Sequence, residues 1–139
     1  MAIRLQGWAR AMLERPRAFG TLATLATDGS PHQAVVWYAL RGDAILVNSA
    51  VGRHWPTNLL RDPRFGFVVE DGYDWVGLRG RAEVLTDPDQ AQEDIADMAR
   101  RYHADDPERA ERLIRDGFQQ QERISFLLHA MAVTEHPDD

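Results

Sequence analysis

The chain has 139 residues, of which 44% are hydrophobic and 27% charged, a composition typical of one folded domain. Its net charge of −6 argues against broad nucleic-acid binding, because affinity for a phosphate backbone needs a basic surface. The absence of cysteine excludes disulfides, thiolate nucleophiles and cysteine-ligated metals. No apolar run approaches the length of a membrane span, so we expect a cytoplasmic protein.

The first part of the chain predicts one helix and three strands. An amphipathic helix is expected at residues 3–15, and Pro16 helps to end it. Strands are expected at residues 19–27, 32–40 and 44–49. Glycine-containing turns separate these strands, which predicts an antiparallel meander with tight connections.

The rest of the chain alternates between helices and strands. Asp-Pro pairs open two of the helices, since Asp caps an N-terminus and Pro fits the first turn. Helices are predicted at residues 53–61, 88–103 and 107–120, and strands at residues 65–70, 75–85 and 124–134. In the strand at 75–85, Gly77 and Gly80 suggest a bulge or a close backbone contact.

Six strands with helices between them predict a mainly β fold with flanking helices. The expected architecture is a six-stranded antiparallel split β-barrel, formed as a single domain over residues 1–139. A barrel of this size fills its interior with side chains, so a large ligand would lie in a groove outside it. A second copy of the chain is the economical way to complete such a groove.

Residues 45–64 contain the strongest chemical signal. A strand that ends at a helix N-terminus gathers free backbone N–H groups, and Arg53 adds a forked cation; proteins hold phosphates in this way. An ordinary surface arginine is the alternative for Arg53. The apolar strand at residues 34–38 offers backbone and aromatic side chains to a flat ring, although Trp37 and Tyr38 would equally suit a core.

Self-contained catalysis finds little support in the sequence. There is no G-x-S-x-G nucleophile elbow and no H-E-x-x-H or similar pair, so no metal site is predicted. Gly77 and Gly80 do not form the dinucleotide fingerprint. We therefore expect a bound redox cofactor to bring the reactivity, while the protein supplies binding, orientation and electrostatics.

Four segments in the right order resemble the pyridoxamine 5′-phosphate oxidase-like superfamily. They are residues 22–32, residues 36–38, Gly52-Arg53 together with residues 58–64, and residues 78–84. The closest branch is the flavin/deazaflavin oxidoreductases common in actinobacteria, many of which use coenzyme F-420. The resemblance implies an FMN-binding-like split β-barrel that forms a homodimer, with two cofactor sites at the subunit interface.

The resemblance also implies which residues form the site. By similarity, the ring lies along residues 35–38 and the loop around Arg53 receives the ribityl phosphate. The proton would come from solvent or from a nearby side chain, for which Tyr38 is the best local choice, with a core role as the alternative. The residues implied in cofactor binding are Val35, Val36, Trp37, Asn48, Ser49, Gly52, Arg53, His54, Asn58, Trp75 and Arg79. Of these, Asn58 supports the phosphate loop, and Trp75 and Arg79 reach either the ring or the neighbouring protomer's site.

One departure from the family pattern concerns the charge at the phosphate. Many relatives carry a lysine close to the position of Arg53, which gives the phosphate two cations, whereas all 16 basic residues of this chain are arginines. His54 occupies that neighbourhood here. A neutral His54 would offer a hydrogen bond, and a protonated one would restore the second charge.

The implied function is an oxidoreductase that uses coenzyme F-420 to transfer hydride to a small unsaturated organic acceptor. An FMN-dependent oxidoreductase is the close alternative, because both cofactors share a ring and a ribityl phosphate. A non-enzymatic carrier of a flavin, haem or tetrapyrrole is the second class, and an interaction module without a ligand is the third. The expected partner is a second copy of the chain, and neither nucleic acid nor a membrane is an expected partner.

Overall fold

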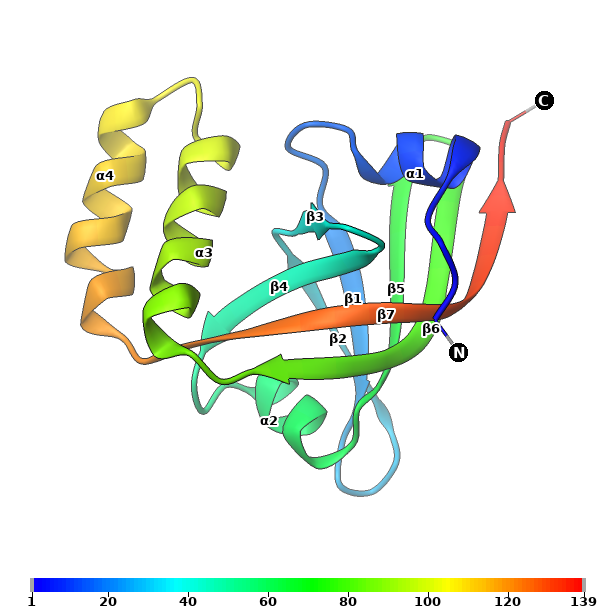
Figure 1. The fold of residues 1–139 in the computed structure, drawn as a ribbon, viewed down its shortest axis with the longest axis horizontal. Helices are drawn as coiled ribbons and strands as arrows, with labels where there is room; N and C mark the ends of the chain where they lie inside the picture. The colour runs from blue at the N-terminus through cyan, green and yellow to red at the C-terminus, as the bar shows by residue number, and fades with distance from the viewer. Residues whose placement is uncertain (1, 139) are drawn as a thin grey trace.

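Seven antiparallel strands form one curved sheet in the computed structural model, which describes residues 2–138 (Figure 1). The strands are β1 (Gly20–Leu25), β2 (Pro31–Val36), β3 (Ala39–Arg41), β4 (Ala44–Ala50), β5 (Arg64–Asp71), β6 (Asp74–Leu85) and β7 (Arg123–His136). Their order across the sheet is β2-β1-β5-β6-β7-β4-β3. The two edges, β2 and β3, do not pair with each other within residues 2–138, so the barrel is not closed.

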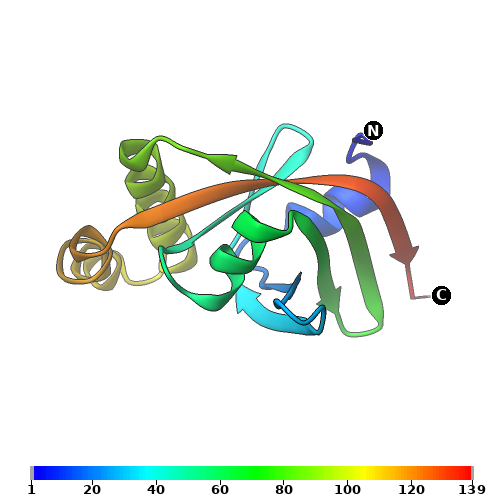
Figure 2. The same ribbon diagram turned by 90° about the horizontal axis from the view of Figure 1, so that it is seen from below.

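The helices surround this sheet on three sides. They are α1 (Gly7–Leu13), α2 (His54–Arg61), α3 (Pro88–Tyr102), α4 (Pro107–Asp116) and the short 3-10 helix η1 (Phe118–Gln120). Helices α1 and α2 lie at opposite ends of the sheet, and α3 and α4 pack together beside it (Figures 1 and 2). None of the helices within residues 2–138 is long and apolar enough to cross a membrane.

The predicted number of strands is wrong because the expected strand at residues 32–40 is two strands. The chain leaves the sheet at Trp37 and Tyr38, between β2 and β3. There the Tyr102 hydroxyl of α3 accepts a hydrogen bond from the Tyr38 backbone N–H at 3.1 Å and lies 3.2 Å from the Tyr38 carbonyl. A side chain on a distant helix thus replaces the sheet as partner of this backbone segment.

The predicted meander of the first three strands is wrong as well. Strand β1 pairs with β2 as expected, but its other neighbour is β5. Strand β4 pairs with β3 and, along its whole length, with β7 from the other end of the chain. After the break at Tyr38 the chain continues at the opposite side of the sheet, where β3 forms the edge and β4 lies next to it.

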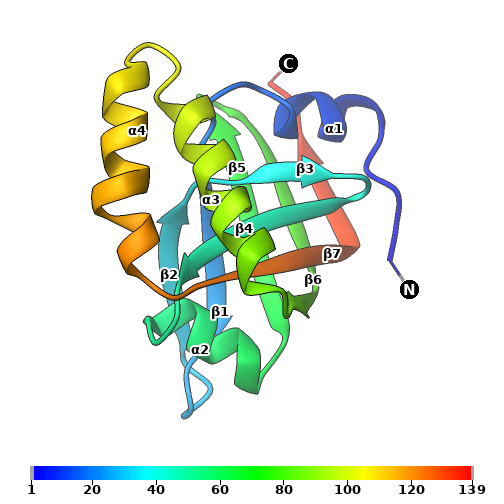
Figure 3. The ribbon, with the colours of Figure 1, turned by 60° about the vertical axis from the view of Figure 1, so that its left-hand side comes forward.

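Strand β4 is buried on both faces. Ile45 and Val47 point into the main core inside the curved sheet. Leu46 points the other way and packs under α3, against Ile95 and Met98. Figure 3 shows α3 lying across β4 and β7. The sheet segment that carries Asn48 and Ser49 is therefore held between two apolar layers.

Two local sequence signals are confirmed by the structure. The Asp87 side chain caps α3 by accepting hydrogen bonds from the backbone N–H groups of Asp89 and Gln90, and Pro88 follows at the first helical position. The register between β6 and β7 shifts between Arg79 and Gly80. A Cβ atom at Gly80 would lie 1.9 Å from the His129 carbonyl oxygen, so the close backbone approach requires glycine.

Replacing Tyr102 by phenylalanine should destabilise the fold. The substitution removes the hydroxyl that bonds the Tyr38 backbone and the Ala18 carbonyl, and leaves a buried N–H without a partner, a loss of roughly 1–3 kcal/mol. Urea denaturation measures the change, and Tyr73→Phe, at a side chain that is 79% exposed, is the matched control. Equal unfolding free energies for the two variants would contradict this role.

Candidate functional site

A pocket of about 250 Å³ brings together the middle and end of β4, the end of β2, the start of α2 and the start of β7. We call it the arginine pocket. Its lining residues are Val35, Val36, Trp37, Asn48, Ser49, Arg53, Trp55, Ile95, Phe118 and Arg123. Most of the residues expected along the ring and at the phosphate are therefore in one place, although they come from separate elements. The lining contains no acidic residue.

Arg123 is a buried cation with only neutral partners. The residue is 6% exposed. Its Nε donates a hydrogen bond to Asn48 Oδ1 at 3.0 Å, and its Nη1 donates to Gln121 Oε1 at 2.6 Å. The guanidinium carbon lies 4.8 Å from the centre of the Phe118 ring. No carboxylate within residues 2–138 forms an ion pair with it.

The electrostatics of the pocket favour an anion. Burial, together with the charge of Arg53, lowers the pKa of Arg123 to about 10. Arg123 is still protonated at neutral pH, so two cations share a pocket without a counter-charge. A buried charge is costly unless another charge compensates it. A bound dianion would relieve both the desolvation of Arg123 and its repulsion by Arg53.

The N-terminus of α2 adds backbone donors next to Arg53. Arg53 is the N-cap residue of α2, and no side chain caps the helix. Gly52, just before it, has a φ of +96°, a left-handed conformation that favours glycine. The first N–H groups of a helix have no partner within the helix. Pro56, the third residue of α2, has no N–H group, so the donors that this helix start offers to a ligand are the N–H groups of His54 and Trp55.

Two further predicted residues lie beside the pocket rather than in it. Asn58 lies on the buried face of α2, and its side chain donates a hydrogen bond to Thr24 Oγ1 at 3.0 Å that attaches the helix to β1. This position suits its expected supporting role. His54 is exposed, and its ring centre lies 5.4 Å from that of His32 at the start of β2.

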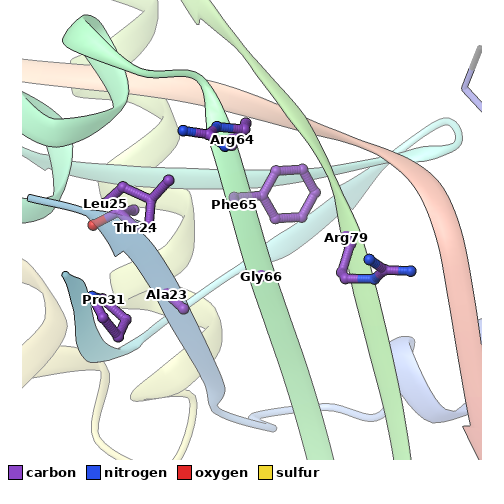
Figure 4. Close-up of a pocket in the computed structure, with 8 residues that line it drawn as sticks. All are labelled: Ala23, Thr24, Leu25, Pro31, Arg64, Phe65, Gly66 and Arg79. Atoms are coloured by element: carbon purple, nitrogen blue, oxygen red, sulfur yellow. The ribbon is translucent and has the colours of Figure 1, made fainter. Parts of the chain in front are cut away.

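Trp75 and Arg79 do not reach the arginine pocket of their own chain. Trp75 stacks on His136, with ring centres 5.3 Å apart. Arg79 lines a separate hollow of about 230 Å³ on the outer face of the sheet, together with Arg64, Ala23 and Gly66 (Figure 4). Any contact that these residues make with a cofactor would have to be made in the site of another chain.

Tyr38 does not line the pocket. It is fully buried, its hydroxyl donates a hydrogen bond to the Leu13 carbonyl at 2.8 Å, and its ring packs edge-on against Phe67. Burial, with a further contribution from Tyr102, raises its pKa. In this structure the hydroxyl is occupied in the core, so the expected proton donor has a structural role instead.

The sequence did not point to the second arginine of the pocket. His54 was the residue whose protonated form would restore a second charge near Arg53, whereas the structure brings Arg123, at the start of β7, into the same pocket as Arg53. Its position follows from the pairing of Ala50 with Arg123 in the β4–β7 register, between segments far apart in the chain. Phe118 and Ile95 were missed for the same reason, because α3 and η1 bring them to the pocket only in the folded protein.

The fold is a split, mainly β barrel with flanking helices, and a comparison with protein families identifies the family of the chain. Residues 6–135 match the family described as pyridoxamine 5′-phosphate oxidase. The chain belongs to this family, which confirms the resemblance seen in the sequence. No curated protein matched the chain.

Solved structures share the fold at low sequence identity. A conserved hypothetical protein from Mycobacterium tuberculosis is 24% identical, with a TM-score of 0.76 over 98% of this chain and 88% of that one. An F-420 reductase is 23% identical, with a TM-score of 0.71 over 93% and 97% of the two chains. The haem storage protein HutZ from Vibrio cholerae is 18% identical, with a TM-score of 0.68 over 96% of each chain.

Inorganic pyrophosphate should bind in the arginine pocket through both arginines. Arg53→Ala and Arg123→Gln each remove a charge-assisted hydrogen bond, worth roughly 1.5–3 kcal/mol, so each should weaken binding by about 10- to 150-fold. Isothermal titration calorimetry measures the affinities, and Arg109→Ala on the exposed side of α4 is the control. An Arg123→Gln variant that binds as tightly as the wild type would remove Arg123 from the site.

Proposed function

We propose that the protein is an oxidoreductase that binds coenzyme F-420 and reduces a small unsaturated organic acceptor. The observation that carries this proposal is the convergence of Arg53 and Arg123 on one pocket without a carboxylate, next to the apolar segment at residues 35–37. A ribityl phosphate suits the cationic end of such a pocket, and a flat ring suits the apolar end. When bound, a reduced deazaflavin supplies hydride.

The protein's own contribution is to hold the cofactor and to orient it. Arg53, Arg123 and the α2 N-terminus would fix the phosphate. Trp37 would form a stiff wall for the ring, because it stacks on Tyr102 with ring centres 5.0 Å apart and meets Phe118 edge-on. Holding two reactants at attack distance can contribute on the order of 7–11 kcal/mol to the rate. The lining contains neither a histidine nor a carboxylate, so solvent would provide the proton.

FMN is the close alternative to the deazaflavin, since no residue in the pocket distinguishes the two rings. A carrier of a flavin, haem or tetrapyrrole is the second candidate function. It is favoured by the same absence of a proton donor among the lining residues, and haem propionates would also suit a pair of arginines. One structural neighbour is a haem storage protein, in keeping with this alternative.

Fluorescence titration with FMN, FAD and coenzyme F-420 should give the tightest binding for coenzyme F-420. The reduced cofactor should then be oxidised in the presence of protein and a quinone or enone. Tight binding of FMN with none of the deazaflavin would reject the proposed cofactor. Tight binding of any of these ligands without turnover would favour the carrier.

We also propose that a second copy completes the site. The arginine pocket, at about 250 Å³, is smaller than most cofactor sites, which occupy about 300–1,000 Å³. Val35, in its lining, is 70% exposed. The outer face around Ala23 and Gly66 has small side chains that allow close approach, and Arg79 stands on it. In a dimer formed through this face, Arg79 would contact the cofactor bound to the partner chain.

The wild-type protein should therefore have the mass of two chains in size-exclusion chromatography with light scattering. Ala23→Arg should convert it to a monomer, because it places a charge in the middle of the proposed contact. Arg109→Glu, on the exposed side of α4, should leave the mass unchanged. A wild-type protein that stays monomeric at high concentration would reject the dimer.

A further inference from the structure

A buried chain of hydrogen bonds leads away from the arginine pocket. Arg123 Nε donates to Asn48 Oδ1 at 3.0 Å, and Asn48 Nδ2 donates to Ser125 Oγ at 2.9 Å. The Ser125 hydroxyl in turn donates to Asp94 Oδ2 at 2.7 Å. The other carboxylate oxygen, Oδ1, accepts a hydrogen bond from Arg41 Nη2 at 2.7 Å. We call the set Arg123, Asn48, Ser125 and Asp94 the Asp94 relay.

The relay has a fixed direction. Asp94 pairs with Arg41 and acts as an acceptor, so the Ser125 hydroxyl donates to Asp94. The Ser125 oxygen then remains as an acceptor for the Asn48 amide nitrogen. A second acceptor for the same nitrogen, the Ala91 carbonyl, lies 2.9 Å away. Asn48 therefore turns its oxygen toward Arg123.

This direction determines which edge of the Arg123 guanidinium is left for a ligand. Asn48 accepts from Nε and Gln121 accepts from one of the two N–H groups of Nη1, while no residue within 2–138 accepts a hydrogen bond from Nη2. The Phe118 ring against the guanidinium restricts its plane. Arg123 is thus held before a ligand arrives, which reduces the entropy lost on binding.

Two residues of the Asp94 relay do not line the arginine pocket. Asp94 and Ser125 are each 1% exposed, and neither is among the lining residues. Asp94 lies on the buried face of α3, beside Ala91 and Ile95, where a carboxylate is unfavourable unless it is fully bonded. The oxygens of Asp94 accept hydrogen bonds from Ser125, Arg41 and Gln90, which offset the cost of burying the carboxylate. The negative charge of Asp94 thus faces the Ser125 hydroxyl.

We propose that Asp94 and Ser125 are positioning residues for the phosphate end of the site. They orient the Asn48 amide and, through it, hold Arg123 with Nη2 directed at the anion. The inference rests on the proposed function in one respect, that the ligand of the arginine pocket carries a phosphate group. It adds two residues that touch no part of that ligand.

The test is a double-mutant cycle between Ser125 and Arg123, with inorganic pyrophosphate as the probe and calorimetry as the readout. Ser125→Ala should weaken binding by about tenfold, as the loss of an outer partner does in metal sites. In an Arg123→Gln background the same change should have no further effect, since the group that it positions is gone. Ser125→Thr keeps the hydroxyl and suits a strand, so it should retain most of the affinity.

A structural role for Ser125 predicts a different pattern. If Ser125→Ala weakens pyrophosphate binding equally in both backgrounds, or leaves the wild-type affinity unchanged, the positioning role is overturned. Ser30→Ala, in the exposed turn between β1 and β2, is the matched control and should bind as the wild type does. The thermal midpoint of each variant verifies that it is folded.

Pyrophosphate binding and cofactor binding together distinguish a failure of this inference from a failure of the proposed function. Pyrophosphate binding that follows the predicted cycle, in a protein that binds neither a flavin nor a deazaflavin, would support the relay and reject the function. Cofactor binding that is insensitive to Ser125→Ala would support the function and reject the relay. A wild-type protein that binds no pyrophosphate would overturn the relay directly.

Discussion

The arrangement of the site depends on one uncompensated charge, the buried guanidinium of Arg123. Two separate parts of the fold, strand β4 and the segment from η1 to Gln121, surround it with neutral groups. Strand β4 supplies Asn48, the segment after η1 supplies Gln121, and η1 supplies the Phe118 ring. Arg53 adds a second positive charge from the start of α2. Each contact orients the guanidinium, and none of them neutralises it.

Such an arrangement lowers the stability of the protein without a ligand. The lowered pKa of Arg123 means that its charged form is disfavoured in the folded state. The fold compensates with two well-packed apolar layers, one inside the barrel and one under α3. A phosphate-bearing ligand would be attracted by the positive charge that no carboxylate of the pocket neutralises. On the proposed function, the site would exchange some folding stability for affinity toward an anion, as functional sites commonly do.

Local sequence signals predicted those features that depend on neighbouring residues. The strand-to-helix junction at Gly52 and Arg53, the Asp87 cap and the close approach at Gly80 are all of this kind. The features that were missed depend on contacts between distant segments. The break at Tyr38 needs Tyr102, and the second cation needs β7 beside β4. No spacing within one segment encodes these pairings, which explains the wrong strand count and the missed Arg123.

The most direct test of the phosphate site compares FMN with riboflavin, which has the same ring and lacks the phosphate. The same comparison applies to coenzyme F-420 and its phosphate-free chromophore. In the wild-type protein the phosphorylated ligand should bind at least about tenfold more tightly, and in Arg123→Gln this preference should largely disappear. Equal affinity for the two ligands in the wild-type protein would contradict the assignment of the arginine pocket as the seat of a cofactor phosphate.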